Sequence, residues 1–269
     1  GKTARVNRLL RNAGGQRLAV LVNEFGELAI DEDLIEAQDD DIISIAGGCV
    51  CCSYGSDLTA ALIELAELDP APDHLLIESS GVAIPGAIVG AVSLLDIFRV
   101  DGVVILADAE TIRQHAASKY MSDTVLRQLS DANIVVLNKT DLVDAAQLKD
   151  MRDWLTRQNP DARIIEAEQG CVPPSVVMGS FLIKSSGLEH HHNTSNLNTE
   201  TLIPAGAVDV DALAQELAAD AAGLIRAKGF ATSHSGQKML IQIVGNRWQT
   251  SEAPAHMDDG IVCLRYATG

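Results

Sequence analysis

Short apolar runs alternate with longer amphipathic stretches over the first 180 residues of the chain. Runs rich in Val, Ile and Leu predict buried strands, and apolar residues spaced three and four positions apart predict helices between them. The predicted strands are 18–23, 41–46, 74–78, 102–107, 133–138 and 163–166, and the predicted helices are 57–68, 86–95, 122–130 and 145–157. This repeated βαβ pattern indicates an α/β fold with a doubly wound, mainly parallel sheet.

The pattern changes after Phe181, where the polar stretch SSGLEHHHNTSNLNTET begins within a few residues. Such a stretch is typical of a linker or mobile loop. Beyond it the sequence predicts a helix over 209–227 that stops at Gly229, and strands at 230–233, 238–244, 247–250 and 261–266. We therefore expect three parts: a large domain at 1–180, a connection at 181–200 and a smaller α+β domain at 201–269.

Composition and charge narrow the class of protein. The chain is 47% hydrophobic but only 3% aromatic, which suits a parallel sheet covered by helices. The net charge of −17 repels phosphate backbones and anionic lipid, so we expect neither a nucleic-acid partner nor a membrane partner. No apolar run is long enough to span a membrane and no signal peptide opens the chain, which favours the cytoplasm and reduced cysteines.

The first three residues, Gly1, Lys2 and Thr3, match the end of the phosphate-binding loop G-x-x-x-x-G-K-[ST]. In such a loop the lysine neutralises the β- and γ-phosphates, and the threonine hydroxyl binds Mg²⁺. We therefore expect a first strand and the start of the loop to precede Gly1. The alternative is a Gly-Lys-Thr sequence of no functional meaning.

A second motif, Asn138-Lys139-Thr140-Asp141, follows the apolar run NIVVL and so lies at the carboxyl end of a predicted strand. Ligands of doubly wound sheets bind at this edge. The Asp141 carboxylate is suited to accept hydrogen bonds from N1 and N2 of guanine, Asn138 to meet the opposite edge, and the Lys139 stem to cover the base. The motif predicts guanine specificity; the alternative is a polar turn in which Asp141 caps a helix.

A third motif, Glu78-Ser79-Ser80-Gly81, ends the predicted strand HLLIE. An acidic residue here can hold Mg²⁺ through water, and a glycine lets backbone N–H groups approach the γ-phosphate. With Lys2 and Thr3, residues Glu78 and Gly81 are the predicted catalytic residues. The alternative is a strand that ends in a small polar turn.

Cys49, Cys51 and Cys52 place three of the five cysteines within four positions, directly before a predicted helix. A helix N-terminus lowers the pKa of a thiol and so favours the thiolate, which is the form that binds metal. Thiolates select Zn²⁺ or Cu(I), and Co²⁺ is also compatible. The sequence therefore predicts a transition-metal site. The alternatives are buried packing residues and a redox pair of thiols.

Three thiolates leave room for a fourth ligand. Glu24 and Glu27, which follow the predicted strand 18–23, are candidates for it, as is an exchangeable water. The alternative for both residues is a solvated turn.

Together these motifs resemble the CobW family, the metal-handling branch of P-loop GTPases that also contains relatives of UreG, HypB and the nitrile hydratase activators. The matching sequences are GKT at 1–3, NEFGE with Asp31 at 23–31, GGCVCC at 47–52, ESSG at 78–81, NKTD at 138–141, RAKGF at 226–230 and QIVG at 242–245. The resemblance implies a GTP-hydrolysing metallochaperone that binds Mg²⁺–GTP and a transition metal, with zinc or cobalt favoured, and releases the metal to a client protein. One departure is Ala4, where the family usually has a second threonine.

Several questions stay open at this stage. A metal store or sensor without productive turnover, and an activator of the nitrile hydratase type, are alternative functions. The metal, the client and the oligomeric state, for which a homodimer is one option, are not fixed by the sequence. His190-His191-His192 is either an auxiliary metal site or a solvated loop, and Cys171 and Cys263 are expected to be lone buried thiols.

Overall fold

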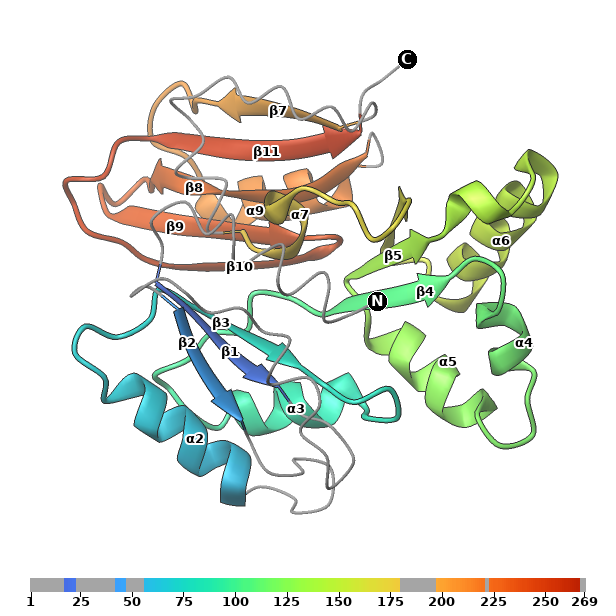
Figure 1. Ribbon diagram of the computed structural model, residues 1–269. Helices are drawn as coiled ribbons and strands as arrows, with labels where there is room; N and C mark the ends of the chain where they lie inside the picture. Colours follow the sequence, from blue (N-terminus) through green and yellow to red (C-terminus); the bar gives the residue numbers. More distant parts are fainter. Residues whose placement is uncertain (1–16, 23–41, 47–55, 180–196, 221–222, 267–269) are drawn as a thin grey trace.

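The computed structural model describes residues 17–22, 42–46, 56–179, 197–220 and 223–266 (Figure 1). Its first part contains two three-stranded parallel sheets, with strand orders β2-β1-β3 and β4-β5-β6. The strands are β1 (Leu18–Val22), β2 (Ile42–Ala46), β3 (His74–Glu78), β4 (Val104–Asp108), β5 (Ile134–Asn138) and β6 (Arg163–Ala167). All their pairings are parallel, which confirms the predicted α/β class.

Helices connect these strands and cover them. They are α2 (Ser56–Ala66), α3 (Pro85–Val92), α4 (Ile112–Ala116), α5 (Ser122–Asp131), α6 (Ala145–Gln158) and α7 (Pro174–Val177), and a short 3-10 helix, η2, spans Thr140–Leu142. Leu58 and Leu62 of α2 pack with Leu21 of β1, while α5 and α6 pack against β5 in a separate cluster. Among the described α-helices, α4 and α7 have no counterpart in the predicted set, because each is too short to show a period.

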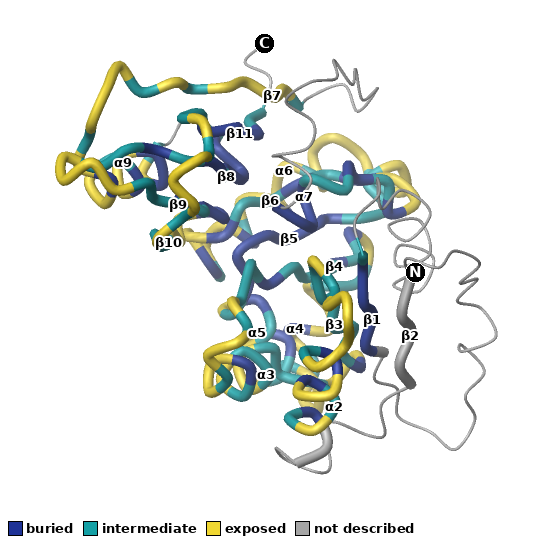
Figure 2. Tube along the Cα trace, turned by 90° about the vertical axis from the view of Figure 1, so that its left-hand side faces the viewer, coloured by how far each residue is buried: buried dark blue, intermediate teal, exposed yellow. Residues whose placement is uncertain are grey.

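The second part is a five-stranded sheet in the order β10-β9-β8-β11-β7. Its elements are β7 (Leu197–Leu202), α9 (Val210–Ala219), β8 (Leu224–Thr232), β9 (Lys238–Val244), β10 (Arg247–Glu252) and β11 (Gly260–Tyr266), and neighbouring strands are antiparallel. The helix α9 packs on one face of this sheet. Side chains of β8 and β11, among them Ile225 and Leu264, join Val20 and Ile134 of the parallel strands in one apolar cluster. Buried residues accordingly concentrate in β1, β5 and β8 (Figure 2).

The predicted helix over 209–227 is wrong in its second half, because α9 ends at Ala219 and β8 begins at Leu224. Gly223 adopts a φ of 95°, in the left-handed region that favours glycine. The following residues Leu, Ile, Arg and Ala tolerate a helix, but β8 is the central strand of its sheet and hydrogen-bonds to β9 and β11 on its two sides. Tertiary pairing therefore overrides helix propensity. The predicted connection at 181–200 overlaps a strand, because β7 begins at Leu197.

Gly229 lies inside β8 rather than at the end of a helix, and a Cβ atom there would be 2.0 Å from the Gly260 carbonyl oxygen and 2.5 Å from the Ile261 Cα. These atoms belong to a paired backbone that cannot move aside. We expect Gly229→Ala to lower the free energy of unfolding by about 3 kcal/mol, measured by urea denaturation. Gly260→Ala is the matched control, because its Cβ meets the Thr201 Cγ2 at an ordinary 3.6 Å. Equal stability of the two variants would contradict this steric account.

No helix within the described ranges is both long enough and apolar enough to cross a bilayer.

Candidate functional site

The described motif residues lie at the carboxyl ends of the parallel strands, and the strand ends within each sheet share one edge. In one sheet Asp108, Asn138 and Ala167 are aligned across β4, β5 and β6, each at the last position of its strand. In the other sheet Val22 pairs with both Ala46 and Glu78 at the ends of β1, β2 and β3. Loops that leave this end of a parallel sheet form the usual ligand site of such folds.

The end of β5, at Asn138, and the turn that follows it are tied to the end of β6 and the turn after that strand. The Asn138 Oδ1 accepts a hydrogen bond of 2.6 Å from the Gly170 N–H, and the Thr140 Oγ1 donates one of 3.3 Å to the Ala167 carbonyl. Gln169 and Gly170 both have positive φ, so the second turn bends sharply toward the first. The two turns therefore form one cross-linked platform.

Lys139 is held by two acidic residues. Its Nζ lies 2.5 Å from the Asp108 Oδ2 and 3.9 Å from the Glu110 Oε2, and its backbone has a φ of 62°. Burial disfavours the charged carboxylate of Asp108, but hydrogen bonds from Lys139 and the Glu110 N–H outweigh it and hold the pKa of Asp108 below its usual value. The bond with Asp108 raises the pKa of Lys139. The lysine stem is thus fixed beside Asn138 while its head stays charged.

Asp108 belongs to none of the motifs found in the sequence, although its position directly after a predicted strand marks it as a candidate site residue. The predicted strand 102–107 ends immediately before it, beside the strand that carries Asn138. An acidic residue at that point of a parallel sheet is a natural partner for a lysine in the neighbouring turn.

Asp141 is exposed and lies in η2, one residue after its start. The helix α6 is capped by Asp144 instead: its carboxylate accepts a hydrogen bond of 2.8 Å from the Gln147 N–H, and the Gln147 side chain accepts from the Asp144 N–H. The alternative in which Asp141 serves as the helix cap is therefore wrong, and its carboxylate is left available to a ligand.

The segment after β3 is half-buried at Glu78 and buried at Ser80. Among the described residues the Ser80 hydroxyl has no hydrogen-bond partner. A Cβ atom at Gly81 would meet nothing within 4 Å, so the backbone at this residue faces open space. The carbonyls of Gly81 and Ala83 accept hydrogen bonds from Gln128 of α5.

The other predicted site residues lie outside the described residues: Gly1, Lys2, Thr3, Glu24, Glu27, Cys49, Cys51, Cys52 and His190–His192. Within the described parts of the chain, no group of three or more His, Cys, Asp or Glu side chains is placed to hold a metal ion. Cys263 is buried, as expected, and burial raises the pKa of its thiol to about 11. Cys171 is only partly buried.

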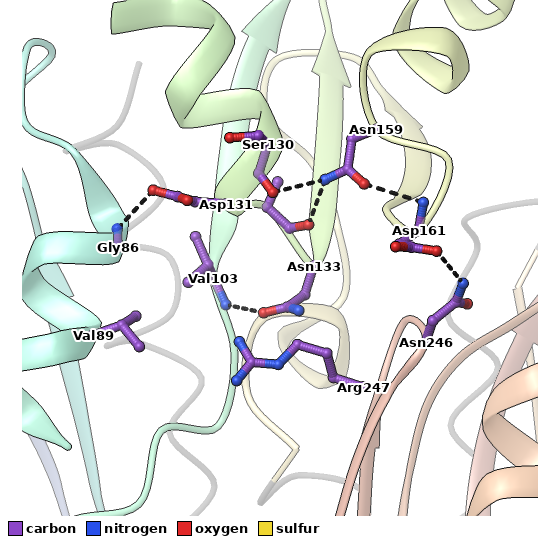
Figure 3. A pocket seen from close by; sticks show the side chains of 11 residues that line it. Gly86, Val89, Val103, Ser130, Asp131, Asn133, Asn159, Asp161, Asn246 and Arg247 are labelled. Carbon is purple, nitrogen blue, oxygen red and sulfur yellow. Dashed lines mark hydrogen bonds between the residues drawn. The ribbon is translucent and has the colours of Figure 1, made fainter.

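A cavity of about 340 Å³ lies away from these strand ends, near the starts of β4 and β5 (Figure 3). Gly86 and Val89 of α3 form one wall, and Asn246 of the β9–β10 turn and Arg247 at the start of β10 form part of the opposite one. None of the site residues predicted from the sequence lines it.

Comparisons with known proteins agree on one family. The model for the nucleotide-binding domain of CobW, HypB and UreG matches residues 1–166. The zinc chaperone CobW of a Sinorhizobium species is 32% identical, over 92% of this chain and 82% of the relative. The zinc chaperone CobW of Pseudomonas aeruginosa is 29% identical, over 92% and 78%.

Among solved structures, a zinc-bound triple mutant of the GTPase YjiA has a similar fold, with a TM-score of 0.50. It is 19% identical, and the match covers 99% of this chain and 91% of that chain.

Proposed function

Because the chain belongs to the CobW/HypB/UreG family and is a GTPase, we propose that it is a metallochaperone that uses GTP hydrolysis to control a bound transition metal. Zinc is the favoured cargo, since the relatives that match most of the chain are named zinc chaperones. Cobalt fits the same thiolate ligands. The recipient is a client metalloprotein, docked partly on the antiparallel sheet.

The observation that carries this proposal is the alignment of Val22, Ala46 and Glu78 at one edge of the sheet β2-β1-β3. Residues 23–27, with Glu24 and Glu27, follow Val22 directly, and the cysteine motif follows Ala46. Glu78 itself begins the third motif. The segments proposed to bind metal and those proposed to sense phosphate therefore start from adjacent strand ends.

The guanine base is assigned to the carboxyl edge of the other parallel sheet, β4-β5-β6. Asn138, Lys139 and Asp141 recognise guanine, and the cross-linked turns after β5 and β6 keep them in place before the ligand arrives. Such preorganisation reduces the cost of binding. Gly1, Lys2 and Thr3 hold the phosphates.

The residues assigned to Mg²⁺ suit a hard cation, because the Thr3 hydroxyl and the Glu78 carboxylate offer oxygen ligands. Glu78 is half-buried at the end of β3. When bound, Mg²⁺ neutralises charge on the β- and γ-phosphates.

We propose a coupled switch. With GTP bound, the segment that carries Glu24 and Glu27 is ordered toward the γ-phosphate and completes the metal site of Cys49, Cys51 and Cys52. Hydrolysis removes that restraint, and the metal passes to the client.

Coupling of this kind predicts that zinc affinity depends on the nucleotide. We expect full-length protein loaded with a non-hydrolysable GTP analogue to bind zinc about tenfold more tightly than protein loaded with GDP, measured by competition with a chromogenic chelator. Replacing Cys49, Cys51 and Cys52 by serine abolishes tight binding in both states, whereas the control Cys171→Ser retains it. Equal affinities in the two nucleotide states would contradict the switch, and phosphate release that zinc leaves unchanged would indicate a metal store instead.

A further inference from the structure

The helix α5 reaches across to the segment that follows β3. The Gln128 Nε2 donates hydrogen bonds of 3.0 Å to the Gly81 carbonyl and 2.8 Å to the Ala83 carbonyl. A single side-chain amide thus uses both of its N–H groups on one short loop. That loop directly follows Glu78, the residue assigned to the Mg²⁺ site.

A second residue of α5 holds the start of α3. The N-cap of α3 is Ile84, whose side chain cannot accept a hydrogen bond, and the next residue, Pro85, has no N–H. The following N–H, that of Gly86, donates a hydrogen bond of 2.7 Å to the Asp131 Oδ2 (Figure 3). Asp131 therefore supplies the capping acceptor that the helix's own residues lack.

Polar contacts add to the apolar packing that positions α3. Val92, at the last position of α3, is the helix's one buried residue. Ile88 and Ala91 are partly buried against the cluster that contains Leu21, whereas Gly86 and Val89 line the cavity of about 340 Å³. The face of α3 that carries Gly86 and Val89 therefore borders a cavity, and the hydrogen bond from Gly86 to Asp131 helps to hold that face.

The helix α5, in contrast, is firmly anchored. Val125 and Leu129 are buried in the cluster beneath α5 and α6. The Asn159 Nδ2 donates hydrogen bonds of 2.8 Å to the Leu129 carbonyl and 3.0 Å to the Ala132 carbonyl. A firmly anchored helix thus holds the segment after β3 and the start of α3 through three directed hydrogen bonds.

We propose that Gln128 is a positioning residue for GTP hydrolysis: by holding the Gly81 and Ala83 carbonyls it fixes the Glu78–Gly81 segment relative to the strand that carries Asn138. Asp131 assists by fixing the start of α3. This inference rests on the proposed function, in which Glu78 and Gly81 act at the γ-phosphate.

The test uses full-length protein with two substitutions that remove the donors differently. Gln128→Met keeps the length of the side chain without polar atoms, and Gln128→Glu keeps its shape while donating nothing at neutral pH. We expect each to lower kcat for GTP by about tenfold, as the loss of two directed hydrogen bonds would. Affinity for GDP should stay within about twofold of wild type, because the guanine site is untouched.

Two further variants serve as controls. Gln128→Lys restores N–H donors on a side chain of similar reach, and we expect it to recover most of the lost turnover. Arg127→Met makes the same kind of change one residue away, where the side chain is 64% exposed and forms an ion pair with Asp123 of the same helix, and should leave kcat unchanged. An unchanged kcat in both donor-removing variants would overturn the proposal. A loss of kcat accompanied by an equally large loss of GDP affinity and by a lower melting temperature would also overturn it, because it would indicate a general loss of structure.

Glu78→Gln, measured in parallel, separates this proposal from the one on which it rests. Full turnover in Glu78→Gln would contradict the assignment of the segment to the phosphate site. A loss in Glu78→Gln together with normal turnover in both donor-removing Gln128 variants would contradict only the positioning role.

Discussion

Replacing Asp141 by asparagine is expected to lower the affinity of the full-length protein for GTP by about 100-fold, because two hydrogen bonds from guanine to a charged acceptor are lost or weakened. The amide presents one acceptor and one donor where the carboxylate presents two acceptors. Xanthine, which has an oxygen in place of the guanine amino group, matches that new pattern. The variant should therefore prefer xanthosine triphosphate, and competition against a fluorescent guanine nucleotide measures both affinities.

The structure offers a matched control for this substitution at Asp144, three residues further along the chain. Asp144 caps α6 and plays no part in the proposed base site. Because asparagine is also a good N-cap, Asp144→Asn should change neither the stability by much nor the preference between nucleotides. An unchanged preference for GTP in Asp141→Asn would show that another group reads the base.

The second large effect is expected at the ion pair between Arg226 and Asp101, which joins β8 to the start of β4. Arg226 is 1% exposed, and its Nη1 lies 2.5 Å from the Asp101 Oδ2. The Arg226 Nη2 also donates to the Val177 carbonyl at 3.2 Å, and the Gly179 N–H donates to the Asp101 Oδ2 at 3.0 Å. Arg226→Met leaves a buried carboxylate without its cation and should lower the free energy of unfolding by about 4 kcal/mol.

The same pair predicts how stability depends on pH. Burial by itself would raise the pKa of Asp101, but Arg226, His74 and the Gly179 N–H more than offset it and lower that pKa to about 2. Because the folded-state pKa lies below the ordinary value of 3.8, the stabilisation is complete above that value and is lost as the pH falls from about 4 to 2. The stability advantage of wild type over Asp101→Asn should shrink over that range.

Urea denaturation of wild type, both single variants and the double variant between pH 2 and pH 7 measures these effects. The exposed pair of Arg113 with Asp150 provides the control, and Arg113→Met should cost less than about 0.5 kcal/mol. A cost for Arg226→Met as small as that of the control would contradict the structural role of the buried pair.

The sequence predicts much of the first part of the fold because its strands are short apolar runs that end in chemically distinctive residues. Asn138 ends the run NIVVLN, and the structure places it at the last position of β5. The strand β8 is not predictable in this way, since Leu224, Arg226 and Lys228 are compatible with a helix and only pairing with two neighbouring strands decides their conformation.

Partners that lie far apart in the chain also escape a sequence analysis. The ion pair between Arg226 and Asp101 joins residues 125 positions apart, and no local pattern links them. Gln128 is one of several polar residues on the amphipathic helix α5, and its spacing predicts only a solvated position. The two hydrogen bonds that support its proposed role form only in the folded chain, where the loop after β3 lies against α5.

The apolar cluster shared by Val20, Ile134, Ile225 and Leu264 bears on how this architecture can be rearranged. Side chains from the antiparallel sheet complete the core beneath the parallel strands, so the two parts are not interchangeable modules. A chimaera that borrows the antiparallel sheet of a relative must also carry compatible residues in β1 and β5, because a mismatch would leave voids or clashes in a common interior. For the client docking proposed here, new specificity is therefore more readily grafted onto the surface of this sheet than obtained by exchanging the sheet as a whole.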